Sequence, residues 1–574
     1  MPTNNCTPIR LAGLTAIFAL TVALLLLLSC SKSHQAHIED GKKYLEQGRY
    51  NEAMIEFRNV TKHGNRNPEA NFQIARVYMQ MGAYPEALRE LEATVGNDHN
   101  RMDAHFEMGN ILMMQRKFIE AREKANLILR RNPDNIEARI LLANSWSGMI
   151  HVNDSVYDIR KGLGQEPRLM PPFFLLETGD GGSQLDAGKA EELYQEIVEL
   201  NGHSTEARLA LGNFYMTRRR NSEAEEQYKA AVRNNSRSLD AVSALGFFYL
   251  RNGRMGEAEE QYKKYVELSE SDDLDNRVIL PDFYLASGEI DLGIRILERM
   301  IADNPQSIVF KRRLASVFFD QRAFDKAEAL ADELLEKYPE DATAHSIKGR
   351  LRLGQSMGAE AVSHFLIVTQ RRPRSTQARY FLGRAYLQNG EPSKAATEFE
   401  SAVALDPSNY RAMLSLASLR LETGNLDEVV QLAQKALSLN PDFDEARLIM
   451  GTALASQKNY RAAATELLAY VEKNPDNSAG MIQLGKVQMA QGNSAAAESG
   501  FEAALKIDPD NLSAMAELVR LYEAQKKPDR AVARINAQIQ KSARTTEFYE
   551  LLGRFYENQG NTEKAEEAYR KIKD

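Results

Sequence analysis

Cysteine is nearly absent from this 574-residue chain and occurs only at Cys6 and Cys30. Residues 31–574 can therefore form no disulfide, no thiolate metal site and no cysteine nucleophile. An excess of basic charge is also missing, because the formal net charge is -8. Proteins that bind nucleic acid usually carry a basic domain, so we expect no nucleic-acid partner.

Catalytic motifs are missing as well: there is no P-loop, zinc-protease or dinucleotide-binding motif. The stretch from Gly354 to Gly358 matches the G-x-S-x-G pattern, but it falls in a predicted turn between helices. A nucleophile elbow needs a strand before its serine. His34 and His37 have metal-like spacing but no further ligands nearby. We therefore expect no enzyme activity, no catalytic residue, no metal site and no cofactor.

A single long apolar run is present, from Leu11 to Leu28. It follows Arg10, the one charged residue among the first ten, and so has the layout of a secretory signal. A run of this length could also form an uncleaved membrane span. The run leads into Leu-Leu-Ser-Cys at residues 27–30, which resembles the lipobox of bacterial lipoproteins.

The lipobox resemblance implies that residues 1–29 are removed as a signal peptide and that Cys30 carries a lipid anchor. Residues 30–37 would then be the lipidated cysteine and its linker. Ser31, rather than Asp, follows the cysteine, which by analogy favours the outer membrane of a Gram-negative envelope over the inner membrane. We therefore expect a lipid-anchored protein of the bacterial cell envelope that faces the periplasm.

Beyond His37 the sequence repeats with a period of 34 residues, apart from two steps of 35. A small residue, mostly alanine, marks each of sixteen units, and we number it position 20 of its repeat. Other positions then align, with glycine recurring at position 8, an aromatic residue at position 11 and proline at position 32. Examples of position 20 are Ala53, Ala224, Ala395 and Ala565.

Period and pattern together resemble the tetratricopeptide repeat (TPR) family over about residues 34–574. The resemblance implies an all-α protein, an α-solenoid wound as a right-handed superhelix of about sixteen helix-turn-helix repeats. In repeat eleven we expect helices at about 376–389 and 393–405, with Gly390 ending the first. One helix pair cannot bury its apolar face alone, so neighbouring pairs must stack to form the core.

Two places depart from the repeat pattern. Residues 150–188 lack most marker residues and contain a Pro-Pro pair, which indicates either a hinge or a dedicated binding loop. We divide the array there, into N-terminal repeats at 38–170, with repeat four degenerate, and repeats five to sixteen at 171–574. Pro281 lies inside the first helix of repeat eight and should kink it.

In TPR arrays, positions 2, 5, 9 and 12 of the first helix face the concave groove. By this resemblance, position 9 supplies a ligand surface of amides and cations. Five of the seven position-9 residues in repeats ten to sixteen are basic, which predicts a positive row for an anionic ligand. The alternative is ordinary solvated charge, and Glu547, Glu550 and Glu557 are placed to neutralise the last cation. The candidate groove residues are Asn110, Asn144, Asn213, Arg350, Arg384, Lys486, Arg520 and Arg554.

The lipobox, linker and TPR array together resemble the TPR lipoproteins of the PEP-CTERM/exosortase system, with Gly41, Tyr44, Gly48 and Ala53 carrying much of the likeness. The resemblance implies a periplasmic scaffold for protein–protein interactions in exopolysaccharide assembly or export. Its partners would be peptide or protein segments of an envelope assembly. Two alternatives stay open: a pilus or outer-membrane protein assembly factor, and direct binding of an anionic polysaccharide.

Overall fold

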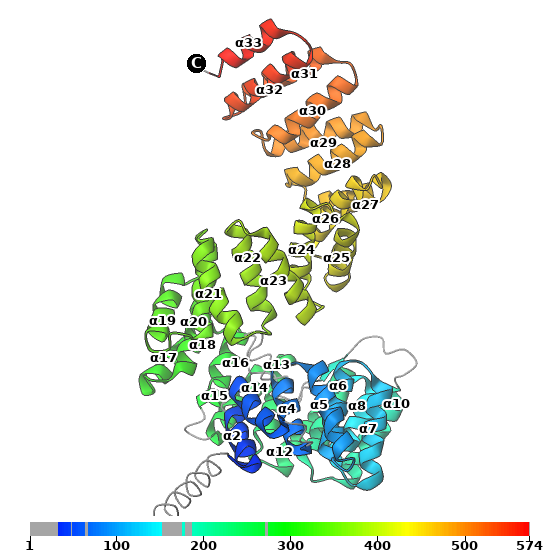
Figure 1. Ribbon diagram of the computed structural model, residues 1–574, viewed down its shortest axis with the longest axis vertical. Coiled ribbons are helices and arrows are strands. Elements are labelled where there is room, and N and C mark those ends of the chain that lie inside the picture. The colour runs from blue at the N-terminus through cyan, green and yellow to red at the C-terminus, as the bar shows by residue number, and fades with distance from the viewer. Residues whose placement is uncertain are drawn as a thin grey trace, which may run out of the picture. The chain divides into compact units, whose positions relative to one another are not determined.

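The computed structural model describes residues 32–46, 49–62, 67–151, 175–177, 186–269 and 274–572. The chain forms two compact units, Met1–Lys337 and Tyr338–Asp574, which we call the first unit and the second unit. Within each unit, helices of similar length follow one another as hairpins (Figure 1). None of the described helices is long and apolar enough to cross a membrane.

The first unit is built from the following elements: α2 His34–Glu46, α3 Tyr50–Thr61, α4 Pro68–Gln80, α5 Tyr84–Asn97, α6 Met102–Met114, α7 Phe118–Arg131, α8 Ile136–Ser147, β1 Met149–His151, β2 Leu175–Glu177, α10 Ala187–Leu200, α11 Thr205–Thr217, α12 Asn221–Asn234, α13 Leu239–Arg251, α14 Met255–Leu268, α15 Leu274–Arg277, α16 Ile279–Ala286, α17 Ile290–Asp303, α18 Ile308–Asp320 and α19 Phe324–Lys337.

The second unit is entirely helical in its described residues, with α20 Ala342–Gly354, α21 Gly358–Arg371, α22 Thr376–Gln388, α23 Pro392–Leu405, α24 Tyr410–Glu422, α25 Leu426–Leu439, α26 Asp444–Ser456, α27 Tyr460–Lys473, α28 Ser478–Ala490, α29 Ser494–Ile507, α30 Leu512–Ala524, α31 Pro528–Ile539, α32 Thr545–Asn558 and α33 Thr562–Arg570.

Polar side chains cap the start of many first helices, which begin at or next to position 1 as the repeat register predicts. In repeat eleven, Ser375 accepts a hydrogen bond from the Ala378 N–H at 3.1 Å, so α22 begins at Thr376 with an otherwise unpaired donor satisfied. The capping residues of other first helices are Asn67, Asn135, Ser204, Ser238, Ser307, Asp341, Asn409, Asn477 and Asn511.

The turn between the two helices of a repeat contains a left-handed residue at position 15. Gly390 has φ 76°, which confirms its predicted role at the end of α22. Glycine adopts this conformation without steric cost, whereas other residues are strained there. The same position is nevertheless occupied by Arg116, Arg219, Arg322, Ser356, Lys458 and Lys526, with φ between 55° and 63°.

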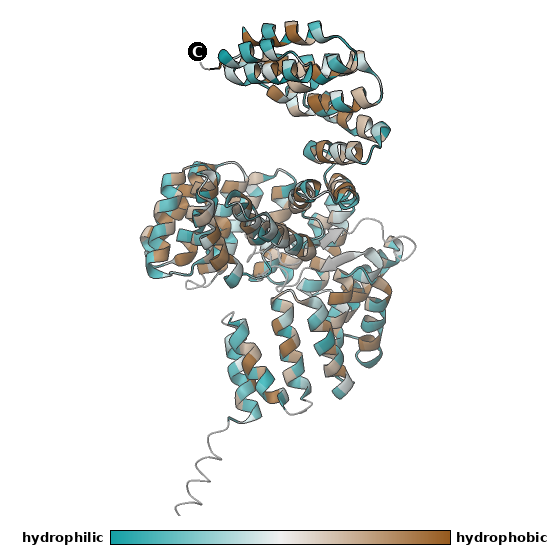
Figure 2. Cartoon of the chain, turned by 45° about the horizontal axis from the view of Figure 1, so that its top comes forward, coloured by the Kyte–Doolittle hydropathy of each residue, from teal (hydrophilic) through white to brown (hydrophobic). Residues whose placement is uncertain are grey.

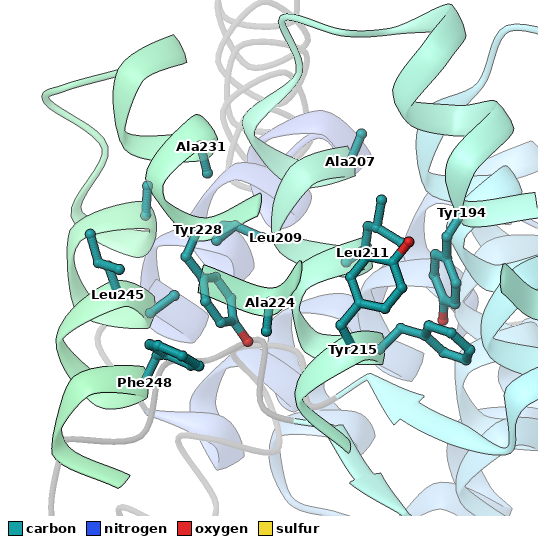
Figure 3. Close-up of a cluster of buried hydrophobic side chains, with 14 of the residues drawn as sticks. Tyr194, Ala207, Leu209, Leu211, Tyr215, Ala224, Tyr228, Ala231, Leu245 and Phe248 are labelled. Carbon is teal, nitrogen blue, oxygen red and sulfur yellow. The ribbon is translucent and has the colours of Figure 1, made fainter. Parts of the chain in front are cut away.

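Small residues let the paired helices approach closely. A Cβ added to Gly383 at position 8 would lie 2.6 Å from the ring of Phe399, a position-24 residue on the second helix. At the same place in the first unit, a Cβ on Gly212 would lie 2.9 Å from the Tyr228 ring. Figure 3 shows Tyr228 buried with its apolar neighbours in this core, and Figure 2 shows apolar and polar residues alternating around the helices. Position 24 therefore fills the space that position 8 leaves open.

Repeats four and five contribute one described helix each. The first helix of repeat four, α8, packs directly against the second helix of repeat five, α10. The sixteen sequence repeats thus yield fifteen helix pairs in the described part of the chain. Between α8 and α10, β1 and β2 pair antiparallel with Ile150 opposite Leu176, a small addition to an otherwise helical array. The predicted boundary at 170/171 and the Pro-Pro pair lie outside the described residues.

The first helix of repeat eight is interrupted, as Pro281 predicts. It consists of α15 and α16, separated at Val278. Proline has no N–H to donate, and its ring clashes with the carbonyl four residues earlier, here Arg277. The break therefore falls where the helical hydrogen-bond pattern cannot continue.

Candidate binding surface on the first helices

First helices of neighbouring repeats contact one another directly. In the second unit such contacts join α20 to α22, α24 to α26, α26 to α28, α28 to α30 and α30 to α32. The second helices of neighbouring repeats make fewer contacts with each other. The array of each unit therefore curves toward its first helices. We call the surface formed by α20, α22, α24, α26, α28, α30 and α32 the inner surface of the second unit.

Two of the predicted groove amides, Asn144 and Asn213, are buried inside helix pairs. Each is only 2% exposed. Their side-chain oxygens accept hydrogen bonds from the hydroxyls of Tyr194 at 2.5 Å and Tyr228 at 2.6 Å. Both tyrosines are labelled in Figure 3, and burial raises the pKa of each. The structure thus gives these amides a place in the core, and they are not available to a ligand.

Asn110, the third predicted amide, lies at the border of the core. It is half-buried, and its Nδ2 donates to Glu107 Oε2 at 3.5 Å. Burial raises the pKa of Glu107. An amide beside a carboxyl group in this setting offers little attraction to an anionic ligand.

A buried ion pair at position 9 of repeat eight was not predicted from the sequence. Asp282 is 2% exposed, and its Oδ1 accepts from Arg313 Nε of the next first helix at 2.5 Å. A buried carboxylate is costly without such a partner. A signal was present in the sequence, since an acid in the helical core pattern of repeat eight is followed by an arginine in repeat nine.

At the N-terminal end of the array, the position-9 cation Lys42 and a second cation, Arg101, face one carboxylate. Lys42 Nζ lies 2.7 Å from Glu69, and Arg101 lies 2.6 Å from the same group. Burial acts to raise the pKa of Glu69, but the bonds from Lys42 and Arg101 outweigh it and hold the pKa to about 2. The positive charge here is therefore matched within the protein.

The inner surface of the second unit begins with two guanidinium groups near one aromatic ring. Arg350 in repeat ten lies 5.4 Å from the centroid of Phe381, and Arg384 in repeat eleven lies 5.9 Å from it. Arg350 is half-buried and Arg384 is exposed. Among the described residues, no carboxylate forms an ion pair with Arg384. We call Arg350, Phe381 and Arg384 the arginine–phenylalanine cluster.

The later cations of the predicted row lie beside carboxylates. Glu517, with a side chain 9% exposed, stands between Lys486 Nζ at 3.9 Å and Arg520 Nη1 at 3.2 Å. Arg554 pairs with Glu550 at 2.6 Å, as expected under the alternative of ordinary solvated charge. Cations one repeat apart thus share a neighbouring side chain, Phe381 at the start of the surface and Glu517 farther along it. Arg384 is exposed without an ion pair among the described residues, whereas the cations toward the C-terminus are partly neutralised by glutamates.

Cys30, the predicted site of lipid attachment, lies outside the described residues. The segment assigned to the linker is partly helical, because α2 begins at His34. His37 Nδ1 lies 2.5 Å from Glu56 Oε2, and Lys32 also bonds Glu56, at 3.2 Å. In the described part of the chain, no group of three or more His, Cys, Asp or Glu side chains is arranged to hold a metal ion.

Family models of the tetratricopeptide repeat match most of the described array, at residues 44–108, 183–236, 209–273, 284–351, 348–410, 382–442, 421–484, 488–555 and 546–573. The chain belongs to the tetratricopeptide repeat family. The sequence prediction of a TPR solenoid is confirmed. TPR proteins bind peptides or proteins, and the fold is that of an interaction scaffold.

Several solved structures are similar to this chain. The APC/C heterotetramer Cut9-Hcn1 is 16% identical, covering 93% of this TPR chain and 98% of that chain, with a TM-score of 0.37. YrrB, described as a TPR protein with an unusual peptide-binding site, is 20% identical, with coverage of 34% and 97% and a TM-score of 0.30. A TPR protein from Parabacteroides merdae is 20% identical, with coverage of 42% and 92% and a TM-score of 0.35. No curated protein sequence matches the chain.

Proposed function

We propose that this TPR protein is a lipid-anchored periplasmic scaffold whose second unit binds acidic polypeptide segments on its inner surface. The arginine–phenylalanine cluster supports this proposal most directly. Arg384 is exposed beside an aromatic face, so a carboxylate can pair with the guanidinium while an apolar side chain covers the ring of Phe381. A peptide that alternates acidic and apolar residues offers both groups at short spacing.

Affinity on such a surface must come from several contacts together. An exposed ion pair contributes only about 0.5–1 kcal/mol and is screened by salt. Lys486 and Arg520 can add contacts further along the surface, although each now lies near Glu517. We therefore expect modest binding that weakens as the ionic strength rises.

We further propose that the scaffold serves exopolysaccharide assembly or export from the outer membrane. The support is the lipobox-like sequence ending in Cys30, joined to a TPR array, as in the lipoproteins of the PEP-CTERM/exosortase system. The structure leaves only Lys32 and Ser33 as described residues before α2 begins at His34. An anchor at Cys30 would therefore hold the first repeat close to the membrane surface.

Ligand class is tested by competition. A fluorescent peptide of alternating Glu and Leu is bound to the full chain, and displacement is measured with unlabelled peptide, with its Lys-for-Glu counterpart and with polygalacturonate. Displacement by the acidic peptide alone supports the proposal. If polygalacturonate competes and the acidic peptide does not bind, the surface recognises anionic polysaccharide instead.

Anchoring is tested separately, through Cys30→Ala. We expect this variant to lose metabolic labelling with a fatty acid and to escape cleavage by the lipoprotein signal peptidase. Normal processing and membrane retention of the variant would contradict the lipid anchor and favour an uncleaved helix. Deletion of the gene should reduce secreted polysaccharide, whereas a loss of pili or outer-membrane proteins with normal polysaccharide would point to the assembly-factor alternative.

A further inference from the structure

A polar pair recurs at positions 4 and 23, where it joins the first and second helices of one repeat. In each case an arginine of the first helix reaches an oxygen of the second helix, nineteen residues later. The pairs, measured from Nη1 of the arginine to the side-chain oxygen, are Arg208–Gln227 at 2.8 Å, Arg379–Glu398 at 2.9 Å and Arg447–Glu466 at 2.9 Å.

Repeat ten has two histidines at these positions. His345 Nδ1 and His364 Nδ1 lie 2.8 Å apart, and His345 Nε2 lies 2.8 Å from the carbonyl oxygen of Pro339. The carbonyl can only accept, so His345 Nε2 must carry its hydrogen. Neutral His345 then has an acceptor at Nδ1, and His364 Nδ1 donates to it. The neutral pair is thus a complete hydrogen-bonded link between α20 and α21.

Full protonation is incompatible with this geometry. With both rings charged, each Nδ1 carries a hydrogen, so two donors and two like charges face each other. Around His364 lie Lys348 and Arg352 of α20 and Glu360 of α21. The other helix packed on α21 is α22, which carries Arg384 and also Arg379, the latter paired with Glu398.

These surroundings disfavour a charged His364. Burial has the largest effect, and the electrostatic repulsion from His345, Lys348 and Arg352 adds to it. Together they lower the pKa of His364 to about 4. A histidine whose pKa is lower in the folded than in the unfolded chain stabilises the fold fully above about pH 6.5. That stabilisation is lost as the pH falls from about 6.5 toward about 4.

We propose that repeat ten is an acid-sensitive joint, in which protonation of the His345–His364 pair loosens α20 from α21. Repeats eleven and thirteen hold an ion pair at the same positions, and this pair keeps its attraction until its carboxylate is protonated. Arg350 also lies on α20, so under the proposed function acid would disturb one side of the arginine–phenylalanine cluster. The array would then release its ligand more readily in an acidified compartment.

Hydrogen exchange on the full chain tests the joint without reference to any ligand. Protection of the amides in α20 and α21 is compared at about pH 7 and about pH 5 after correction for intrinsic exchange. The α22–α23 pair, with Arg379–Glu398, is the internal control. Because His364 is half-exposed, we expect protection of α20 and α21 to fall by about tenfold relative to this control.

Two variants identify the histidines as the cause. The double variant His345→Arg/His364→Glu copies repeat eleven and should abolish the difference between the two helix pairs. His364→Gln copies position 23 of repeat six and retains a hydrogen-bond donor for His345. Because it removes the imidazole of His364, it should reduce the acid-induced loss of protection. This variant keeps the test valid if the double variant does not fold. An equal loss of protection in both wild-type helix pairs, or an unchanged acid response in His364→Gln, would overturn the proposal.

Discussion

Position 9 has opposite surroundings in two parts of the molecule. In repeats four to eight of the first unit, Asn144, Asn213 and Asp282 are buried and bonded within the protein. In the second unit, Arg384 and Arg520 at the same position are exposed. The same repeat position therefore supplies core polar groups in repeats four, six and eight and exposed charge at Arg384 and Arg520 of the second unit.

The residue at position 24 explains much of the difference. Tyr194 and Tyr228 carry buried hydroxyls that need an acceptor, and the position-9 amide provides it. Phenylalanine at position 24, as at Phe399 in repeat eleven, has no hydroxyl and needs no acceptor, and there Arg384 is exposed. Position 9 should therefore be interpreted together with position 24, and an asparagine opposite a tyrosine belongs to the core.

Exchanging the position-9 residues between the units should give the largest change in the free energy of unfolding. Asn213→Arg places a charge inside the pair α11–α12 and should lower the free energy of unfolding by about 3–5 kcal/mol. Arg384→Asn removes an exposed side chain and should change it by at most about 0.5 kcal/mol. Chemical denaturation, with hydrogen exchange to locate the damage, measures both changes. Similar losses in the two variants would show that position 9 has the same surroundings in both units.

Removing one hydroxyl should give a smaller effect. Tyr228→Phe deletes the donor to Asn213 Oδ1 inside the core and should cost about 1–2 kcal/mol. Tyr380→Phe, at a half-buried tyrosine of the second unit, is the matched control and should cost less than about 0.5 kcal/mol. The difference between the two melting curves is the measurement. A neutral Tyr228→Phe would mean that the tyrosine does not account for the buried amide.

The sequence register predicted most of the helices because each repeat carries its own signals. Repeat eleven was expected at 376–389 and 393–405, and α22 and α23 lie at Thr376–Gln388 and Pro392–Leu405. The contact between α8 and α10 could not be predicted, because a period of 34 residues gives the chain length of a repeat and does not say which helices pack together. The role of Asn213 was missed for another reason: its tyrosine partner lies fifteen residues away on the second helix.

The turn at position 15 is common to both units and should give the smallest effect. Arg322→Gly in the first unit and Lys458→Gly in the second relieve a left-handed conformation of a non-glycine residue. Each should raise the free energy of unfolding by about 0.5–1 kcal/mol. Gly390→Ala should lower it by about 1 kcal/mol. If Arg322→Gly and Lys458→Gly changed the free energy of unfolding in opposite directions, the turns of the two units would not be equivalent.

Charge reversal at Arg384 is the sharpest test of whether the inner surface of the second unit binds acidic polypeptide. The affinity of the full chain for the Glu-Leu peptide is measured for wild type, Arg384→Glu and Arg461→Glu, which makes the same charge change at an exposed arginine on the second helix α27. We expect Arg384→Glu to weaken binding by about five- to tenfold, to gain affinity for the Lys-Leu peptide and to remain folded, with Arg461→Glu within about twofold of wild type. Equal affinities of the two variants for the acidic peptide would show that Arg384 does not contribute to binding and that the inner surface is not the peptide site.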